Sequence, residues 1–381
     1  MVLVILSSTS ALYIGREQTI NGRYPQEINI YVSKSGYDEN YLEEAVKLDE
    51  ITRNIVEENG AEMNGLRAYS VYTVSGYLEN DVVEVNPESV KGFPMIDYDK
   101  LVAFELFGVD EFNRAFGFDE HVEPGKMLIG TAKKTKIGDN LTIGGHTYEI
   151  EGRIDNKISK IDPSAAGSPI AQVFVVVDDV EAFARELNGL SEGAGFNVVS
   201  WSWDMHFDTG LDVDGQIALA GAINTAVCEE LHDKGYTAGY CESREGARDD
   251  FVGTFGGLFF LGILLSIIFL VSCVLIIYYK QISEGLEDQA RFGIMQKVGM
   301  SSKDIKSSIN SQMLTVFMIP IIIAGLHLLV VLPVIDKLLM LFGLYNMNLL
   351  LVCAGICLLI CGLFYAVIYK VTSNAYYKIV S

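Results

Sequence analysis

The chain has 381 residues, of which 28 are basic and 49 acidic, so its formal net charge is −21, and half of its residues are hydrophobic. Residues 16–250 carry 44 acidic and 20 basic residues, a net of −24, whereas the remainder is slightly basic at +3. The acidic segment would repel nucleic acid. The long apolar runs outside it exclude a soluble enzyme.

Four apolar segments predict membrane spans over residues 1–15, 251–279, 313–335 and 349–369. A span needs about 20 apolar residues, and the first segment reaches only about 22 Å as a helix. A signal peptide requires a basic segment before its apolar run, and no basic residue stands there in this chain. We therefore interpret residues 1–15 as an incomplete transmembrane helix of an N-terminally truncated chain, with a signal peptide as the alternative.

Basic residues in the short connections predict the orientation, because lysine and arginine concentrate in cytoplasmic loops. Residues 336–348 hold only Lys337, beside Asp336. This predicts that segments 280–312 and 370–381 are cytoplasmic, and that 16–250 and 336–348 lie outside a plasma membrane. The basic residues of the two cytoplasmic segments are Lys280, Arg291, Lys297, Lys303, Lys306, Lys370 and Lys378.

The external segment 16–250 reads as an α+β domain inserted between the first and second spans. Strands are predicted at 27–32 and 67–77 around a helix at 41–58, and at 197–209 and 236–242 around a helix at 213–234. A β-rich lobe is expected near 120–180, with a hairpin at Gly144-Gly145 and a strand at 173–177. Asp178-Asp179 can cap the helix that follows this strand.

Two features of this domain admit a second interpretation. Cys228 and Cys241 could form one disulfide, although the chain is no disulfide scaffold. The oxygen-rich run that begins at Asp204 invites a calcium site, but Thr209 and Gly215 stand where an EF-hand needs Gly and Glu. Strand alternation explains the run without a ligand, so we predict no metal site. The run comprises Asp204, His206, Asp208, Asp212 and Asp214.

Segment 280–312 predicts an amphipathic helix on the cytoplasmic side. Apolar residues recur every fourth position from Ile282 to Val298, with charged residues on other faces. Gly299 is expected to end the helix, and Ser301 with Asp304 to cap the next one. Because the first half is acidic, a protein partner is favoured over the lipid surface, which is the alternative.

The sequence KQISEGLEDQARFGIMQKVGMSSKDIKSSINSQ resembles the coupling segment of FtsX/MacB-type ABC transporter permeases. The order of one span, an external domain and three spans is that family's module, and KKTKIGDNLTIGGHTYEIEGRID resembles its β-rich lobe. The segment around Glu284 to Ile309 and the Gly325–His327 region are similar to the Gram-positive branch, which includes peptide-antibiotic transporters. The resemblance implies that this helix docks on an ABC ATPase subunit.

The expected ATPase contact combines apolar anchors with a charged rim. Its candidate residues are Glu284, Leu286, Arg291, Ile294, Met295 and Val298, with Gly299 ending the helix. The pattern G-x-x-x-x-G-K-[ST] does not occur in the chain, so ATP hydrolysis is expected on the partner subunit, and no cofactor is predicted.

The resulting hypothesis is a permease subunit that couples ATP hydrolysis to movement of the external domain, for export or detoxification of antimicrobial peptides or for handling lipids or lipoproteins. Two alternatives remain open: a regulator of a cell-wall hydrolase, and a sensor subunit that signals to a histidine kinase. Other expected partners are membrane lipid and a second permease module, as a homodimer or a pseudo-dimer.

Within the spans, three features stand out. His327 is the one ionisable group, and therefore a candidate functional residue unless it only bonds a neighbouring helix. Pro320 and Pro333 are expected to kink their span. Cysteines at 353, 357 and 361 share one helix face, which favours close helix packing over a metal site.

Overall fold

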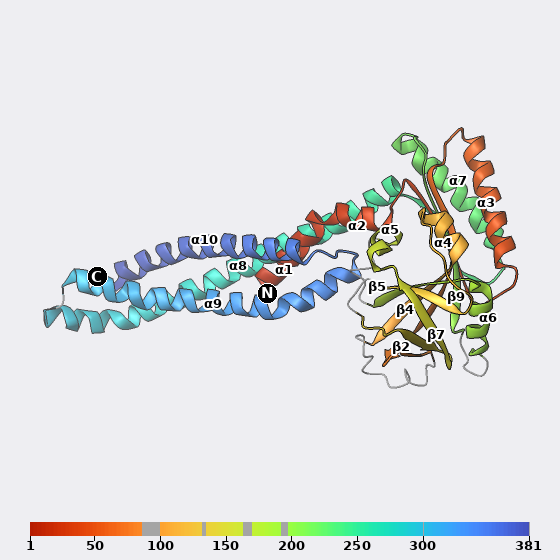
Figure 1. Ribbon diagram of the computed structural model, residues 1–381. Coiled ribbons are helices and arrows are strands. Elements are labelled where there is room, and N and C mark those ends of the chain that lie inside the picture. The colour runs from red at the N-terminus through yellow and green to blue at the C-terminus, as the bar shows by residue number, and fades with distance from the viewer. Residues whose placement is uncertain (86–99, 132–134, 163–169, 192–196, 300, 381) are drawn as a thin grey trace. The chain divides into compact units, whose positions relative to one another are not determined.

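The computed structural model describes residues 1–85, 100–131, 135–162, 170–191, 197–299 and 301–380. These residues form two compact units. We name residues 17–250 the sheet domain, and residues 1–16 together with 251–381 the helical unit. Figure 1 shows both units.

Two interleaved β-α-β units form one half of the sheet domain. The first consists of β1 (Ile28–Ser35), α3 (Tyr41–Glu58) and β2 (Asn64–Glu79), and the second of β9 (Val199–Asp208), α7 (Val213–Leu231) and β10 (Tyr236–Ser243). Their strand order is β10-β1-β9-β2, and β9 is antiparallel to both β1 and β2. β9 of the second unit therefore lies between β1 and β2 of the first, and β1 of the first lies between β9 and β10 of the second. All six elements were predicted from the sequence, and they are confirmed.

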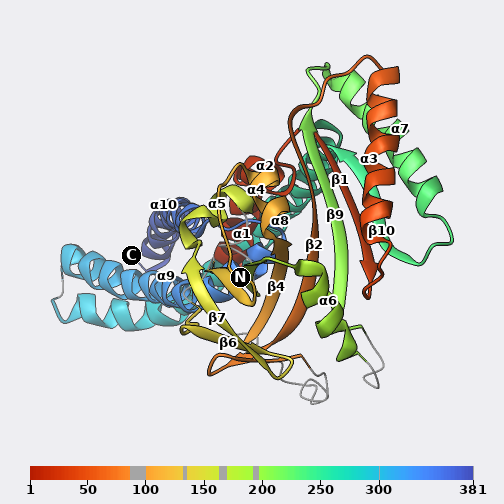
Figure 2. The ribbon, with the colours of Figure 1, turned by 45° about the vertical axis from the view of Figure 1, so that its right-hand side comes forward.

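The alternation of β9 explains how this sheet acquires its core. Five apolar side chains of β9 are buried beneath α3 and α7, which lie side by side over β1, β9 and β10 (Figure 2). Among them, Trp201 stacks on Tyr41 of α3 with 4.7 Å between the ring centroids. Burying one such side chain contributes roughly 1.5–3 kcal/mol, so this face holds the two helices in place. The five residues are Val199, Trp201, Trp203, Met205 and Phe207.

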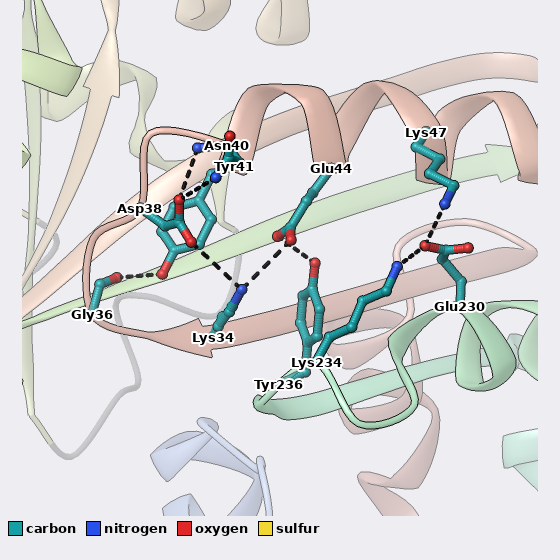
Figure 3. Close-up of polar contacts among 10 residues, drawn as sticks. All are labelled: Lys34, Gly36, Asp38, Asn40, Tyr41, Glu44, Lys47, Glu230, Lys234 and Tyr236. Atoms are coloured by element: carbon teal, nitrogen blue, oxygen red, sulfur yellow. Dashed lines mark hydrogen bonds and ion pairs between the residues drawn. The ribbon is translucent and has the colours of Figure 1, made fainter.

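Polar contacts fasten α3 and α7 to each other and to the ends of their strands (Figure 3). Lys47 of α3 lies 2.7 Å from Glu230 of α7, and Lys34 of β1 lies 3.5 Å from Glu44 of α3. The Tyr236 hydroxyl of β10 donates to the same Glu44 carboxylate. Exposed ion pairs contribute about 0–1 kcal/mol each, so these contacts orient the helices more than they stabilise them.

The other half of the sheet domain includes the strands of the β-rich region that the sequence predicts near residues 120–180. Its strands continue the same sheet in the order β2-β3-β6-β7-β5-β8-β4, and β4 pairs back with β2 to close a ring. The 16-residue β2 is long enough to serve both halves, and one hydrophobic cluster runs through both. The additional strands are β3 (Val82–Glu84), β4 (Leu101–Gly108), β5 (Lys126–Thr131), β6 (Asn140–Ile143), β7 (His146–Arg153) and β8 (Ala171–Val177).

Local signals in this part are confirmed. Gly144 and Gly145 both have positive φ, which glycine adopts freely, and they join the antiparallel β6 and β7. The Asp179 carboxylate accepts the backbone N–H of Ala182 at 2.9 Å and caps α6 (Val180–Gly189).

Cys228 and Cys241 are free thiols, so the disulfide alternative is not realised. The remaining elements are α2 (Arg16–Arg23), α4 (Val109–Phe116), α5 (Ile158–Ile161) and a 3-10 turn, Asp155–Lys157.

The helical unit contains α1 (Val2–Ile14), α9 (Ser302–Leu341), α10 (Met347–Val380) and most of α8 (Arg244–Lys297). Of the described helices, three (α8, α9 and α10) are long and apolar enough to cross a membrane. The apolar α1 has 13 residues, and its role as a fourth span stays a prediction. The chain therefore fits a membrane protein with a sheet-rich domain ahead of three long apolar helices.

Helix packing in this unit confirms the interpretation of the cysteine row. Cys353 and Cys357 are buried in one cluster with Leu12 of α1 and Leu332 of α9, and Cys361 packs against it. The helices extend further than the sequence suggested. α9 contains Pro320 and Pro333 and extends into the expected 336–348 turn, where it ends at Leu341. α10 extends into the expected C-terminal tail and ends at Val380. No helix-breaking residue lies at either point.

Candidate functional site

The predicted coupling helix is the C-terminal part of α8, not a separate element. α8 runs without a break from Arg244 to Lys297 and so includes the expected span and the expected amphipathic helix. Nothing between Tyr279 and Lys280 interrupts the chain of helical hydrogen bonds, since neither Pro nor a turn motif stands there. The helix ends two residues before Gly299, whose φ of +107° suits glycine, as predicted for the C-terminus.

One face of this C-terminal part packs against α9 and α10. Phe292 is 8% exposed and joins a cluster with Ile309, Met313, Phe317 and Tyr376. Two turns earlier on the same face, Gly285 approaches Tyr376 so closely that a Cβ at this position would lie 3.1 Å from the Tyr376 ring. This face therefore requires a small residue at position 285, beside the Tyr376 ring, and a large apolar residue at position 292, inside the cluster.

Hydrogen bonds fix the same face. The Tyr376 hydroxyl donates to the Asp288 carboxylate at 2.8 Å, and the Arg291 guanidinium donates to the other Asp288 oxygen at 3.2 Å. Nearby, the Ser373 hydroxyl of α10 and the Asn310 side chain of α9 are 2.8 Å apart. The end of α8 is thus attached to α10 through a charged hydrogen bond, and α10 to α9.

The opposite face carries the predicted contact residues, and they are exposed. The exposed fraction is 60% for Leu286, 63% for Ile294 and 84% for Val298, with Met295 beside them at 45%. Exposure at this level in four apolar side chains on one helix end is typical of a surface that meets another molecule. The charged members of the predicted set lie beside this row. Glu284 contacts Gln281 and Lys280 of its own helix, and Arg291 is largely exposed.

Sequence reasoning missed the residues that anchor the helix. It followed the apolar row at every fourth position, whereas Gly285 and Phe292 lie seven apart on another face. The seven-residue spacing of a small and an aromatic residue was the available signal. The importance of Phe292 depends on Tyr376, which lies 84 positions later in the chain and which periodicity cannot place.

The other predicted residues are not part of this surface. His327 is exposed on α9, and its role stays a prediction. Ser301 directly precedes α9 as the cap prediction requires. The side chain of Asp304, the second member of that motif, lies outside the described residues.

Comparison with known proteins gives a partial likeness. No protein-family model matches the chain. Over 70 residues the chain is 29% identical to the ABC transporter permease protein YxdM of Bacillus subtilis (strain 168). The matched segment covers 18% of this chain and 11% of that protein. The chain is thus similar in part to a protein named as an ABC transporter permease.

Proposed function

We propose that this chain is the membrane subunit of an ABC transporter of the FtsX/MacB type, and that the exposed face at the end of α8 binds the ATPase subunit. The observation that carries the proposal is the contrast between the two faces of this helix end. Phe292 and Asp288 fix one face to the neighbouring helices, while Ile294 and Val298 project from the other. A partner that binds the exposed face would therefore act on a helix held in a defined orientation.

The continuity of α8 supports a mechanical role. A helix of 54 residues is about 80 Å long, and α8 follows the last strand of the sheet domain directly. Its first turn is attached to that domain: the Arg244 N–H donates to the Glu27 carbonyl at 2.8 Å, and Arg248 pairs with Glu17 at 3.2 Å. In this proposal the ATPase moves the Lys297 end of α8 in the cytoplasm, and the helix passes that movement to the sheet domain outside.

Photo-cross-linking tests the partner. A photoreactive phenylalanine analogue would replace Val298 in the full chain, expressed in its own host, with the same analogue at Gln289 as the control. Gln289 lies on the same helix and is exposed, but it is not in the apolar row. We expect the probe at position 298 to capture a protein that carries a P-loop, and the probe at 289 to capture much less. Capture of lipid alone by the 298 probe would contradict the proposal.

A charge substitution tests the function of the contact. Ile294→Asp places a carboxylate in the exposed row, and we expect it to reduce the permease-dependent ATPase rate at least tenfold, because burying an unpaired charge at an interface costs several kcal/mol. Gln289→Asp adds the same charge outside the row and should leave the rate near that of the wild type. An unchanged rate in Ile294→Asp would reject the assignment.

A further inference from the structure

A cavity of about 380 Å³ lies inside the sheet domain, on the face of β9 opposite α3 and α7. Alternation places the polar residues of β9 on this face, and cross-strand pairing sets them beside their neighbours. Asp204 of β9 lies between Tyr31 of β1 and Tyr69 of β2 in one row. Glu105 of β4 lines the same cavity, α4 contributes Phe116 and α5 contributes Ile161 to its wall, and Asp162 lines it directly after α5.

Two carboxylates in this cavity have no partner. Within the described parts of the sheet domain, neither Glu105 nor Asp204 accepts a hydrogen bond or forms an ion pair. Burial, reinforced by the charges of Asp162 and Asp204, raises the pKa of Glu105 to about 8. Burial alone raises the pKa of Asp204 to about 7. Both side chains keep a small accessible surface, and both line the cavity.

The basic groups around the cavity do not neutralise these carboxylates. The Arg67 guanidinium donates to the Lys160 carbonyl at 3.4 Å, and the guanidinium of Arg23 lies 5.7 Å from the Tyr24 ring. The Nδ1 atom of His206 lies 3.0 Å from the Asn29 side-chain oxygen. Burial and the charge of Arg67 lower the pKa of His206 to about 4, so this imidazole is neutral at pH 7.

Aromatic rings form the remaining wall. Tyr69 lies 5.0 Å from Phe116 and 6.0 Å from Phe107, measured between ring centroids, and both phenylalanine rings line the cavity with it. Aromatic faces together with carboxylates attract organic cations, since the rings offer negative potential and the carboxylates offer full charge. A metal ion fits less well, because across the described chain no three potential ligands converge.

We propose that this cavity binds an ammonium or guanidinium group of a ligand, held by the carboxylates of Glu105 and Asp204 against the rings of Tyr69 and Phe116. The volume suits a group of that size, at the lower end of ligand pockets. The cation can be a free amine or guanidine, or the side chain of a basic peptide. The proposal concerns the sheet domain alone and does not depend on the ATPase contact.

Calorimetric titration of the full chain in detergent tests this, with four probes: agmatine, cadaverine, tetra-arginine and tetra-lysine. At about pH 9 both carboxylates are ionised, and we expect at least one probe to bind. Glu105→Gln and Asp204→Asn should each weaken that binding at least tenfold. Binding by agmatine or cadaverine assigns the site to a free small molecule, and binding by the peptides alone assigns it to a peptide side chain.

The control is Glu50→Gln, which removes one charge from the exposed surface of α3. It separates a specific pocket from the general attraction of an acidic domain. Phe116→Leu keeps the charges, removes one ring, and should weaken binding by a smaller factor. The proposal is overturned if no probe binds, if Glu105→Gln and Asp204→Asn bind as the wild type does, or if Glu50→Gln weakens binding equally.

Binding should also follow the titration of the cavity, becoming weaker below about pH 7 as Asp204 and Glu105 take up protons. The other titratable or charged groups on the wall come from every element around it: Arg23, Tyr31, Arg67, Tyr69, Asp162 and His206. The low pKa of His206 keeps it neutral through this range, and Tyr69 has a pKa raised well above its usual value by burial. Protonation of the two unpartnered carboxylates, Glu105 and Asp204, therefore accounts for most of the expected loss of binding below about pH 7.

Discussion

Replacing Glu105 with glutamine keeps the shape of the side chain and removes its charge, and we expect this to stabilise the sheet domain at alkaline pH. The pKa of Glu105 is about 8 in the folded chain, against 4.5 for an ordinary glutamate. Below pH 4.5 both states are protonated, so the carboxyl then costs nothing. Between 4.5 and 8 the unfolded chain releases the proton and the folded chain retains it. The free energy of unfolding therefore falls as pH rises through this window.

The two pKa values set the size of the effect. Each tenfold difference between the acid dissociation constants of the folded and unfolded states corresponds to about 1.4 kcal/mol, so a pKa raised from 4.5 to about 8 gives at most about 5 kcal/mol. Water that enters the cavity reduces the cost of ionisation, so about 2–3 kcal/mol is the difference we expect between wild type and Glu105→Gln at pH 9. At pH 5, half a unit above the ordinary pKa, the same relation gives a difference of about 0.8 kcal/mol.

Intrinsic fluorescence reports this domain selectively, because both tryptophans of the chain, Trp201 and Trp203, lie in β9. Urea unfolding of the full chain in detergent would be followed at about pH 5 and pH 9. The control Glu50→Gln removes an exposed charge and should show the pH dependence of the wild type. If Glu105→Gln and the wild type lose the same stability between the two pH values, the Glu105 carboxyl is not held in an unfavourable environment.

Three further substitutions test contacts elsewhere. Asp179→Ala removes the cap of α6 and should cost about 1 kcal/mol in the same fluorescence assay. Glu27→Gln weakens an acceptor of hydrogen bonds from Thr209. Burial opposes ionisation of Glu27, but the hydrogen bonds from Thr209 and Gly210 and the charge of Arg244 together lower its pKa. The substitution should cost about 1–3 kcal/mol at pH 7 and nothing once the pH falls below that lowered pKa. Tyr376→Phe removes the hydrogen bond to Asp288 but keeps the ring, and should speed tryptic cleavage at the end of α8 with little change in the fluorescence transition.

β9 shows how far the sequence determines the fold. Its alternation predicts one apolar and one polar face, and the apolar face with Trp201 is confirmed. The same alternation suggests that Asp204 is solvated, whereas the structure encloses it. The enclosing elements α4 and α5 come from the segment inserted between β2 and β9, and nothing within β9 encodes where that insertion packs. A polar residue on an alternating strand is exposed only if no other element of the chain covers it.

α8 shows the same limit at the candidate contact. The exposed row from Leu286 to Val298 could be predicted, since it depends on spacing within one helix. The fixed face could not, because Phe292 and Gly285 acquire their roles from Tyr376 of α10. Likewise, β2 pairs with β4 although β3 lies between them in the chain, so a prediction based on neighbouring segments did not include the closed ring of strands.

The cavity and the exposed face of α8 belong to different units, so a link between them has to be measured as a coupling free energy. If the sheet domain responds to movement of α8, a ligand in the cavity must change the affinity of the ATPase contact, and the partner must change the affinity of the cavity by the same factor. We expect agmatine to alter the cross-linking yield at position 298 by at least about fivefold, the lower end of typical coupling. Glu105→Gln should abolish that response while leaving the yield without ligand unchanged. A response that persists in Glu105→Gln would place the ligand elsewhere, and a wild-type yield indifferent to agmatine at saturation would show that the two units bind their partners independently.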